Sequence, residues 1–500
     1  MPDMPSEPLV TRREAAQLLG AAAATQLLNA KGSDICFLTA TEMADLIRRK
    51  KLSARETLDA HLKQIERVNP QVNAIVTLVA EQAIENARKA DEAQARGAAL
   101  GPLHGLPIAH KDLVETAGIR TTFGSRIFKD YVPQHDAILV ERIKKAGAIC
   151  VGKTNAPEFG AGSQTFNAVF GATKNPHDLT KTCGGSSGGA AVSLACGMIP
   201  IADGSDSGGS LRNPAAFCGV VGFRTAPGRV AHGAVGDSWS TIAVSGPMAR
   251  NVPDVALLLS VMAGPDPRCP ISITESGSRF AGNLERNFKG ARVAWFKDMG
   301  GIPFDTRVLR VVNAQRKVFE SLGCIVEQAE PDWSGGLEAY DTLRAWGYAS
   351  SQADNIRLHR DLVKDTIQWE AERGSKLTGA DIAHAHTLRS KAWDNMRIFQ
   401  EKYEYFIVPT TQVPPFDVTQ PYPTEVAGVK MSTYIEWMKS CMMISSLENP
   451  SMSMPCGFTP EGLPVGLQIV GRHRDEWSVL QMAHAFEQAT PSSRRRPAIA

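Results

Sequence analysis

Two glycine- and serine-rich segments carry the strongest structural signal in this sequence. Residues 184–189 read Gly-Gly-Ser-Ser-Gly-Gly, and residues 203–212 read Asp-Gly-Ser-Asp-Ser-Gly-Gly-Ser-Leu-Arg. Flexible linkers lie between polar neighbours. Both segments instead adjoin apolar stretches: a small-residue helix predicted over 190–197, a short strand over 199–202 and a glycine-punctuated run over 217–223. The sequence therefore predicts that both segments are loops inside a folded domain.

Strands and helices are expected to alternate on either side of these segments. Apolar runs at 106–109 and 148–152 flank a helix predicted over 136–146, and runs at 292–296 and 324–326 flank another. Such alternation is typical of an α/β fold. The second of these helices is expected over 306–322. The other expected elements are helices over about 53–70, 79–96 and 475–488, strands at 406–409 and 467–471, and a strand-free helical layer over 336–405.

Length and composition limit the class of protein. The 500 residues allow two to four domains or one large α/β domain. With 54 Lys and Arg against 52 Asp and Glu, the net charge of +2 gives no sign of a nucleic-acid partner. No apolar run reaches the roughly 18 residues that cross a bilayer, so no membrane span is expected. The nine cysteines form no CxxC pair, which suits folding in a reducing compartment.

The N-terminal residues allow two interpretations. Thr11-Arg12-Arg13 precedes an Ala- and Leu-rich stretch that ends near Ala30, which resembles a twin-arginine export leader. Glu14 and two glutamines interrupt that pattern, so a plain helix is the competing interpretation. Residues 1–35 are therefore expected to be a leader or an extra helix. The protein is accordingly expected to be cytoplasmic or, with a leader, exported after folding.

Neither segment fully matches any of three known loop chemistries. A phosphate-binding loop needs Lys where this chain has Ala190. A calcium loop starting at Asp203 needs Glu at its twelfth position, which is Pro214. A nucleophile elbow fits Ser186 or Ser187, but the residues before them make a poor strand and no histidine stands out. An α/β-hydrolase-like Ser-His-Asp esterase remains an alternative, and no metal or cofactor is expected.

A lysine offers a base for these serines. Lys111 follows the apolar strand predicted at 106–109, where burial would lower the pKa of its amine toward neutrality. The neighbouring carboxylate of Asp112 is expected to raise that pKa again. Taken alone, a lysine at a strand end is more often a surface charge. Two serines embedded in glycine favour the interpretation of Lys111 as a catalytic base.

Together these features resemble the amidase signature family. The resemblance rests on Lys111, on residues 184–189 and on residues 204–223, with its two key serines 24 positions apart, and it extends over roughly residues 40–490. It implies one large α/β domain with a mixed, twisted sheet covered by helices. The expected division is an amidase domain over 36–490, with a signature core at about 104–250 and a helical specificity region at about 333–445, followed by a tail over 491–500.

The resemblance also implies a Ser–cis-Ser–Lys triad. Ser210 corresponds to the nucleophile, Ser186 to the bridging serine with a cis peptide bond before it, and Lys111 to the general base. The backbone N–H groups implied for the oxyanion hole are those of Ser207, Gly208, Gly209 and Ser210. The residues expected to support the site are Ser187 and the pair Asp206 and Arg212, whose side chains are expected to form an ion pair that shapes the loop. Two departures, Ser205 for the usual Thr and Arg224 for the usual Lys, leave the triad unchanged.

The implied function is an amidohydrolase that cleaves a small carboxylic amide, or an anilide, carbamate or ester, through an acyl-enzyme. It needs no cofactor, and it is expected to act as a monomer or homodimer. An amidotransferase A-type subunit, which releases ammonia for a partner, is the alternative. That relative usually carries Ser-Arg-Tyr-Gly after the signature, which residues 228–234 lack. Specificity is expected to come from residues 333–445 and from the loop over 159–170. An apolar acyl or aryl pocket is one interpretation of the aromatic and methionine residues in the helical region, and ordinary helix packing is the other; these residues are Trp346, Trp437, Met438, Met442 and Met443.

Overall fold

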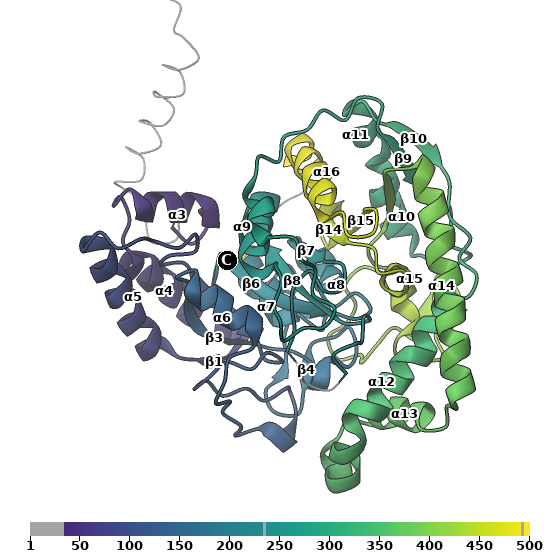
Figure 1. Cartoon of the computed structure of the whole chain (residues 1–500), viewed down its shortest axis with the longest axis horizontal. Helices are drawn as coiled ribbons and strands as arrows, with labels where there is room; N and C mark the ends of the chain where they lie inside the picture. Colours follow the sequence, from purple (N-terminus) through teal and green to yellow (C-terminus); the bar gives the residue numbers. More distant parts are fainter. Residues whose placement is uncertain (1–34, 234–236, 492–494) are drawn as a thin grey trace, which may run out of the picture.

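The computed structural model describes residues 35–233, 237–491 and 495–500 (Figure 1). The expected leader or helix at 1–35 therefore lies outside the described residues except for its last position, and so does part of the expected tail. All nine cysteines are buried and unpaired, as their apolar surroundings indicated.

A mixed sheet of eleven strands forms the centre of a single large α/β domain, as the sequence predicted. In spatial order the strands are β1 (Ile75–Leu78), β3 (Ile149–Thr154), β2 (Pro107–Lys111), β6 (Ile201–Asp206), β8 (Val244–Ala249), β7 (Val221–Arg224), β14 (Ser451–Phe458), β15 (Pro464–Val470), β11 (Tyr405–Pro409), β9 (Arg292–Trp295) and β10 (Ile325–Gln328). The strands β3–β2–β6 and β11–β9–β10 are parallel, and the pairs between β6 and β11 are antiparallel. At one edge of the sheet, β1 is antiparallel to β3.

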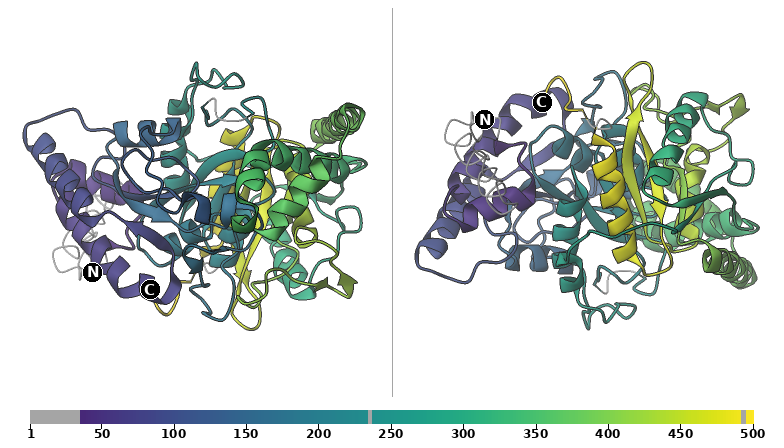
Figure 2. Two further views of the ribbon diagram at one scale, coloured as in Figure 1. Left: turned by 90° about the horizontal axis from the view of Figure 1, so that it is seen from below. Right: turned by 90° about the horizontal axis from the view of Figure 1, so that it is seen from above.

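Helices cover this sheet and extend beyond both of its ends (Figure 2). The N-terminal helices α3–α5 lie at one end of the molecule and α12–α14 at the other. The helices are α3 (Ala40–Arg48), α4 (Ala54–Val72), α5 (Ala80–Ala95), α6 (Ile138–Lys145), α7 (Gly188–Ala195), α8 (Arg212–Cys218), α9 (Val252–Met262), α10 (Thr306–Ala314), α11 (Arg316–Ser321), α12 (Gly336–His359), α13 (Asp365–Gly374), α14 (Gly379–Lys402), α15 (Lys439–Ser446) and α16 (Glu476–Ala489). Two short hairpins pair β4 (Phe166–Asn167) with β5 (Gly171–Ala172) and β12 (Glu425–Val426) with β13 (Val429–Lys430).

Most of the expected elements are present, with three differences. Helix α4 starts near the predicted position, with a capping box formed by Ser53 and Glu56, but it continues through Pro70 to Val72, where Asn73 in the left-handed region ends it. The helix expected over 306–322 is divided at Gln315 into α10 and α11. Strand β6 is longer than predicted, because residues 203–206 pair with β8 and do not form a loop.

Strand β8 itself was not predicted. It contains Gly246 and Pro247, and proline is normally confined to edge strands or bulges. Here a side chain at position 246 would place its Cβ 2.2 Å from the carbonyl oxygen of Phe223, so glycine allows β7 and β8 to approach. The pairing of β8 with residues 203–206 extends β6 into the second glycine-rich segment.

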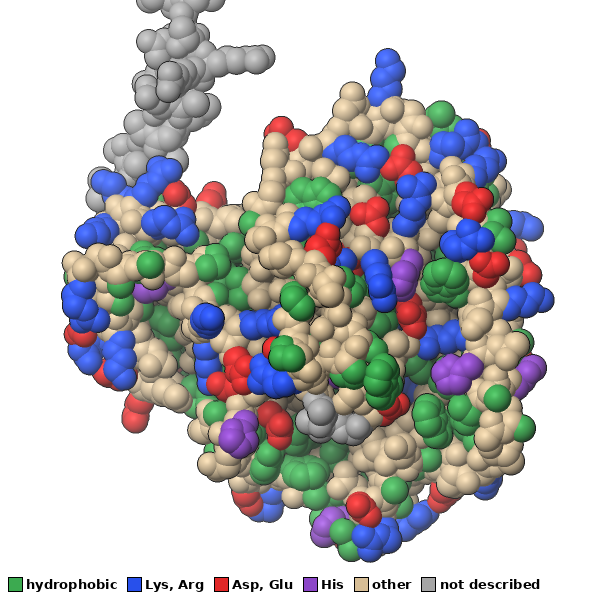
Figure 3. All heavy atoms as spheres, in the orientation of Figure 1, with side chains coloured by type: hydrophobic (Ala, Val, Ile, Leu, Met, Phe, Trp, Pro, Cys, Tyr) green, Lys and Arg blue, Asp and Glu red, His purple; other side chains and the backbone are tan. Residues whose placement is uncertain are grey.

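Charged side chains of both signs are interspersed on the face of the molecule in Figure 3. This agrees with the near-neutral net charge of +2. Over the described ranges, none of the helices combines the length and hydropathy needed to cross a membrane.

Candidate active site

The sheet topology brings Lys111 to the second glycine-rich segment. Lys111 is the last residue of β2 and Asp206 is the last residue of β6, and these two strands are adjacent and parallel. The carboxyl ends of parallel strands meet at one edge of a sheet, where α/β proteins bind their ligands. The base candidate and residues 203–212 are therefore neighbours, although they are far apart in the sequence.

The amine of Lys111 is fully buried among serine hydroxyls. Its Nζ lies 2.8 Å from the Oγ of Ser186, 2.9 Å from that of Ser187 and 3.0 Å from that of Ser205. Burial lowers the pKa of Lys111 to about 7, against the carboxylates of Asp206 and Asp203, which raise it. An amine with this pKa is available as a base near neutral pH.

The sequence interpretation was wrong about which carboxylate opposes the fall in the Lys111 pKa. It named Asp112, the next residue in the chain. The Asp112 carboxylate instead accepts a hydrogen bond from the backbone N–H of Thr122 at 3.1 Å. The two acidic groups that act on Lys111 are Asp203 and Asp206 of β6, which only the pairing of β2 with β6 brings close.

Close packing fixes the loop that carries Ser186. The Gly185–Ser186 peptide bond is cis, as the resemblance implied. Ser163 donates a hydrogen bond to the carbonyl oxygen of Gly185 at 2.6 Å. Glycines follow the serine pair because α7 packs without room for side chains: a Cβ at 188 would lie 2.2 Å from the Oγ1 of Thr165, and one at 189 would lie 2.3 Å from a backbone nitrogen.

Ser210 lines the same cavity as Ser186 and is 6% exposed. Its carbonyl oxygen accepts the N–H of Ser187 at 3.1 Å, which holds the two glycine-rich segments together. Among the described residues, no hydrogen bond joins the Oγ atoms of Ser210 and Ser186. The structure thus forms the Lys111–Ser186 contact of the implied triad directly and places Ser210 beside it.

The implied oxyanion donors are not all available. The N–H of Gly209 donates to the Asp206 carboxylate at 2.9 Å. Ser207, Gly208 and Ser210 line the cavity, and no acceptor for their N–H groups is found among the described residues. Glycine is required at position 209 by its φ of +120° and by Cys441, whose Cβ would lie 2.6 Å from an added Cβ.

A buried ion-pair network shapes this loop. The Asp206 carboxylate accepts from Arg212 Nε at 3.0 Å and Nη2 at 2.9 Å, as the sequence indicated, and it also accepts from Arg224 Nη1 at 3.2 Å. Burial would raise the pKa of Asp206, but the two guanidiniums hold it well below its usual range. Arg212 also donates to Ser445 of α15 at 2.6 Å, so the network links the loop to the C-terminal part of the domain.

Asp206→Asn is expected to lower the free energy of unfolding by about 3–5 kcal/mol, because it leaves two buried guanidiniums without their shared carboxylate. Denaturation in urea measures this loss. Glu85→Gln is the matched control, because it removes an exposed partner of Arg88 and should change stability little. A loss for the Asp206 variant no larger than that of the control would contradict the assigned network.

A second buried pair lies behind the base. His110 Nδ1 is 2.6 Å from the Asp203 carboxylate, and both side chains are fully buried. Burial alone would lower the pKa of His110, yet Asp203 raises it to about 9. The same carboxylate accepts the backbone N–H of Lys111 at 3.2 Å. Sequence reasoning missed this pair, because a histidine and an aspartate 93 positions apart give no local signal.

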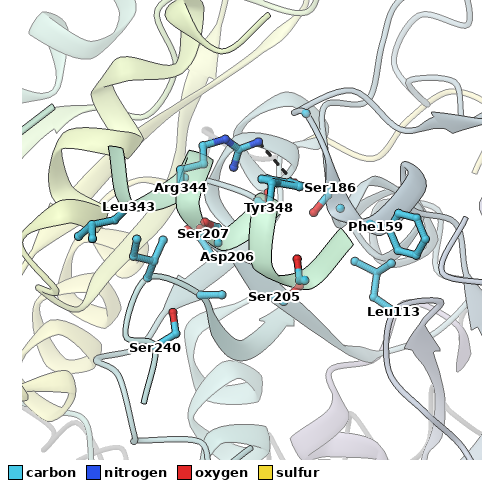
Figure 4. Close-up of a pocket in the computed structure, with 18 of the residues that line it drawn as sticks. Leu113, Phe159, Ser186, Ser205, Asp206, Ser207, Ser240, Leu343, Arg344 and Tyr348 are labelled. Carbon is cyan, nitrogen blue, oxygen red and sulfur yellow. Dashed lines mark hydrogen bonds between the residues drawn. The ribbon is translucent and has the colours of Figure 1, made fainter. Parts of the chain in front are cut away.

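The serines open onto a cavity of about 240 Å³. In Figure 4, Leu113 and Phe159 lie on one side and Leu343 on the other, with serines between them. The helical region and the 159–170 loop both reach the cavity, as expected for segments that would set specificity. Their lining residues are Phe159, Gly160, Gly162, Leu343, Arg344, Gly347, Tyr348, Ser351, Gln352 and Met438.

Three aspects of the cavity were not foreseen. Of the aromatic and methionine residues noted in the helical region, only Met438 lines it, whereas Trp437 stacks on Phe217 in the core. Residues 240, 242 and 243, from the segment before β8, form part of the wall. Arg344 also lines it, and one arginine among many gives no sequence signal. In the part of the chain that the structure describes, no three His, Cys, Asp or Glu side chains gather where they could hold a metal ion.

Comparisons with known proteins show which proteins this chain is similar to. The family model described as Amidase matches residues 56–480. An acylamidase of Rhodococcus erythropolis is 36% identical over 468 residues, which are 92% of this chain and 97% of that protein. The A-type subunit of the glutamyl-tRNA(Gln) amidotransferase of Moorella thermoacetica is 36% identical over 489 residues, 93% of this chain and 99% of that protein. A solved bacterial aryl acylamidase of the amidase signature family superposes with a TM-score of 0.85 at 27% identity, covering 91% of this chain and 96% of that chain.

Proposed function

Since the chain belongs to the amidase signature family, we propose that it is an amidohydrolase that cleaves a carboxylic amide through an acyl-enzyme on Ser210. The observation that carries the proposal is the 2.8 Å contact between Lys111 Nζ and Ser186 Oγ, at the edge of a cavity that Ser186 and Ser210 share. A buried lysine with a pKa near 7 beside hydroxyls in a cavity is the combination expected of a base and a nucleophile.

Acylation uses the three side chains in series. Neutral Lys111 takes the proton of Ser186, and Ser186 takes the proton of Ser210 as its Oγ attacks the carbonyl carbon. The oxyanion that forms accepts hydrogen bonds from backbone N–H groups of residues 207, 208 and 210. Each preorganised donor of this kind is worth about 2.7–4 kcal/mol in the transition state.

Breakdown of the tetrahedral intermediate reverses the path of the proton. The ammonium of Lys111 returns a proton through Ser186 to the leaving amine, which departs as a neutral molecule. Water then enters, loses its proton to the same relay and hydrolyses the ester on Ser210. Amide cleavage depends on this return more than ester cleavage does, because an amine anion is a far poorer leaving group than an alkoxide.

The proposal is tested with a panel of anilides, aliphatic amides, carbamates and esters, assayed with the wild-type protein and with Ser210→Ala. We expect acid and amine products from at least one amide class, and none above background from the variant. Hydrolysis of esters alone, or amide hydrolysis that survives in the variant, would contradict the proposal. The cavity of about 240 Å³ favours the smaller members of each class.

The acylation rate is expected to rise with pH through a single ionisation near 7. Only the neutral amine of Lys111 can accept a proton, so the active fraction is about a tenth at pH 6, a half at pH 7 and nine-tenths at pH 8. His110, with its pKa raised to about 9, stays protonated across this window. The measurement is kcat/KM against pH. A profile that is flat from pH 6 to 8, or that falls, would contradict the role of Lys111.

A second candidate function follows from the A-type amidotransferase subunit, whose sequence identity to this chain, 36%, equals that of the acylamidase. In that role the same serine mechanism would release ammonia from an amide for use by a partner protein. Residues 228–234 lack the Ser-Arg-Tyr-Gly stretch usual in that relative, which favours the stand-alone hydrolase. Glutaminase activity that appears only when a partner protein is added would reverse this order.

A further inference from the structure

One guanidinium of the cavity wall has N–H groups that no described residue uses. Arg344 of α12 is 7% exposed and lines the cavity. Its Nε donates to Glu370 at 2.9 Å, and its Nη2 donates to the hydroxyl of Tyr434 at 2.7 Å. Among the described residues, Nη1 has no hydrogen-bond partner. Because Arg344 lines the cavity, this nitrogen can donate a hydrogen bond to an acceptor that enters there.

The guanidinium is held in one orientation. Its carbon lies 4.9 Å from the ring centroid of Tyr348 and 5.8 Å from that of Tyr434, on two different segments of the helical region. Figure 4 shows Arg344 and Tyr348 projecting from the same helix at the cavity, joined by a long contact of 3.5 Å. Nη1 is therefore a preorganised donor, and little side-chain entropy is lost when it binds an acceptor.

The charge of Arg344 is already balanced. Glu370 lies against it, and Arg373 reaches the other oxygen of Glu370 at 3.3 Å while also pairing with Asp341. These two guanidiniums and two carboxylates sum to zero. A carboxylate brought into this cluster would add an uncompensated buried charge, whereas a carbonyl oxygen would accept the free N–H without one.

The rest of the wall limits where such a carbonyl can be. Leu113, Phe159, Ile242 and Met438 line the cavity with apolar surface. Apart from Asp206 and the serines of the two glycine-rich segments, the polar residues of the wall are Ser240, Arg344, Tyr348, Ser351 and Gln352. A few polar groups among apolar ones are the arrangement by which ligand sites fix orientation. A substrate with an apolar body, its scissile amide and a further acceptor would match this wall.

We infer that Arg344 is a specificity residue whose Nη1 binds a second, uncharged carbonyl oxygen of the substrate, apart from the amide that is cleaved. The natural substrates are then amides that carry an additional ketone, ester or amide carbonyl. This inference rests on the proposed amidohydrolase function and deepens it by naming the substrate class. It assigns Arg344 to binding and not to the chemistry of the serine relay.

Matched substrates test the inference. In one series, a carbonyl replaces each successive methylene of the acyl chain of a p-nitroanilide. A second series is built on N-alkyl amides, and there a carbonyl replaces each successive methylene of the alkylamine. A third series ends the acyl chain in a carboxylate. In the wild type, the best keto substrate should exceed its methylene analogue in kcat/KM by about 10-fold or more, mainly through KM, as a hydrogen bond to a charged donor permits.

Variants assign that preference to Arg344. Arg344→Met and Arg344→Lys should both reduce the ratio to about one. Arg373→Met is the control, because it removes the other guanidinium of the cluster, which lies at a one-third exposed position. It should keep the wild-type ratio. The double variant Arg344→Met with Glu370→Gln, which also removes the charge left unpaired, replaces the single variant if that one does not fold.

Other outcomes overturn the inference. No keto preference in the wild type would do so whatever the variants show, and so would a stronger preference for the carboxylate series or a preference that Arg344→Met retains. Failure of the proposed function looks different: no p-nitroanilide or ester would be hydrolysed and no serine-reactive probe would label Ser210. Labelled, active protein without the keto preference would leave the function standing and remove only the role of Arg344.

Discussion

Ser210→Ala is expected to lower kcat for amide hydrolysis by at least about 10⁴-fold. The variant keeps the cavity, the Lys111–Ser186 contact and the backbone donors, but it has no oxygen to form the acyl-enzyme. The side chain is small and 6% exposed, so the fold and the melting temperature should change little. Steady-state hydrolysis of the best anilide, together with thermal unfolding, makes the measurement.

Ser193→Ala provides the control. Ser193 is a fully buried serine of α7 that donates to the carbonyl oxygen of Gly189 at 2.7 Å and does not line the cavity. This variant should keep activity within a few-fold of the wild type, which separates loss of the nucleophile from a general effect of removing a buried hydroxyl. Retention of a tenth or more of the wild-type rate by Ser210→Ala would show that another group attacks the substrate.

Lys111→Ala is expected to reduce amide hydrolysis by about 10³-fold or more and ester hydrolysis much less. The amine both accepts the proton of the serine relay and returns it to the leaving group. Ester cleavage needs the second transfer less, because an alkoxide leaves more readily. The variant should also lose the rise in rate near pH 7 that the pKa of Lys111 predicts. Parallel assays of one amide and its isosteric ester measure the difference.

Lys153→Met controls for the loss of a buried lysine. Lys153 of β3 is fully buried, burial lowers the pKa of its amine, and its Nζ donates to the Thr116 hydroxyl at 2.9 Å rather than to a serine of the site. This variant should lose stability but keep the wild-type ratio of amide to ester hydrolysis. Equal losses on amide and ester for Lys111→Ala, at both acidic and alkaline pH, would make Lys111 a structural residue.

The parts of this site that the sequence predicted are those with a local pattern. The glycines around Ser186, the two glycines before Ser210, and a lysine at the end of an apolar strand each leave a signal within about ten residues. The pairing of Asp206 with Arg212 is equally local, since six positions separate them. Each of these features can be recognised within one short segment of the sequence.

The parts that the sequence did not predict depend on contacts between distant segments. Asp203 acts on Lys111 because β2 and β6 are paired, and Arg224 joins Asp206 because β7 lies nearby in the same sheet. Arg344 reaches the cavity only through the packing of α12 against the domain. Strand β8 was missed for a different reason: Gly246 and Pro247 contradict strand propensity, and close packing with β7 overrides it.

Covalent labelling with a fluorophosphonate, followed by peptide mass mapping, tests most directly that Ser210 is the nucleophile. The probe phosphonylates a serine that a neighbouring base has activated, and it is bound at the oxyanion donors as an acyl group would be. The proposed mechanism predicts one adduct per chain, on Ser210, formed more slowly in Lys111→Ala and absent in Ser210→Ala. An adduct on Ser186 or Ser187 with Ser210 unmodified would contradict it.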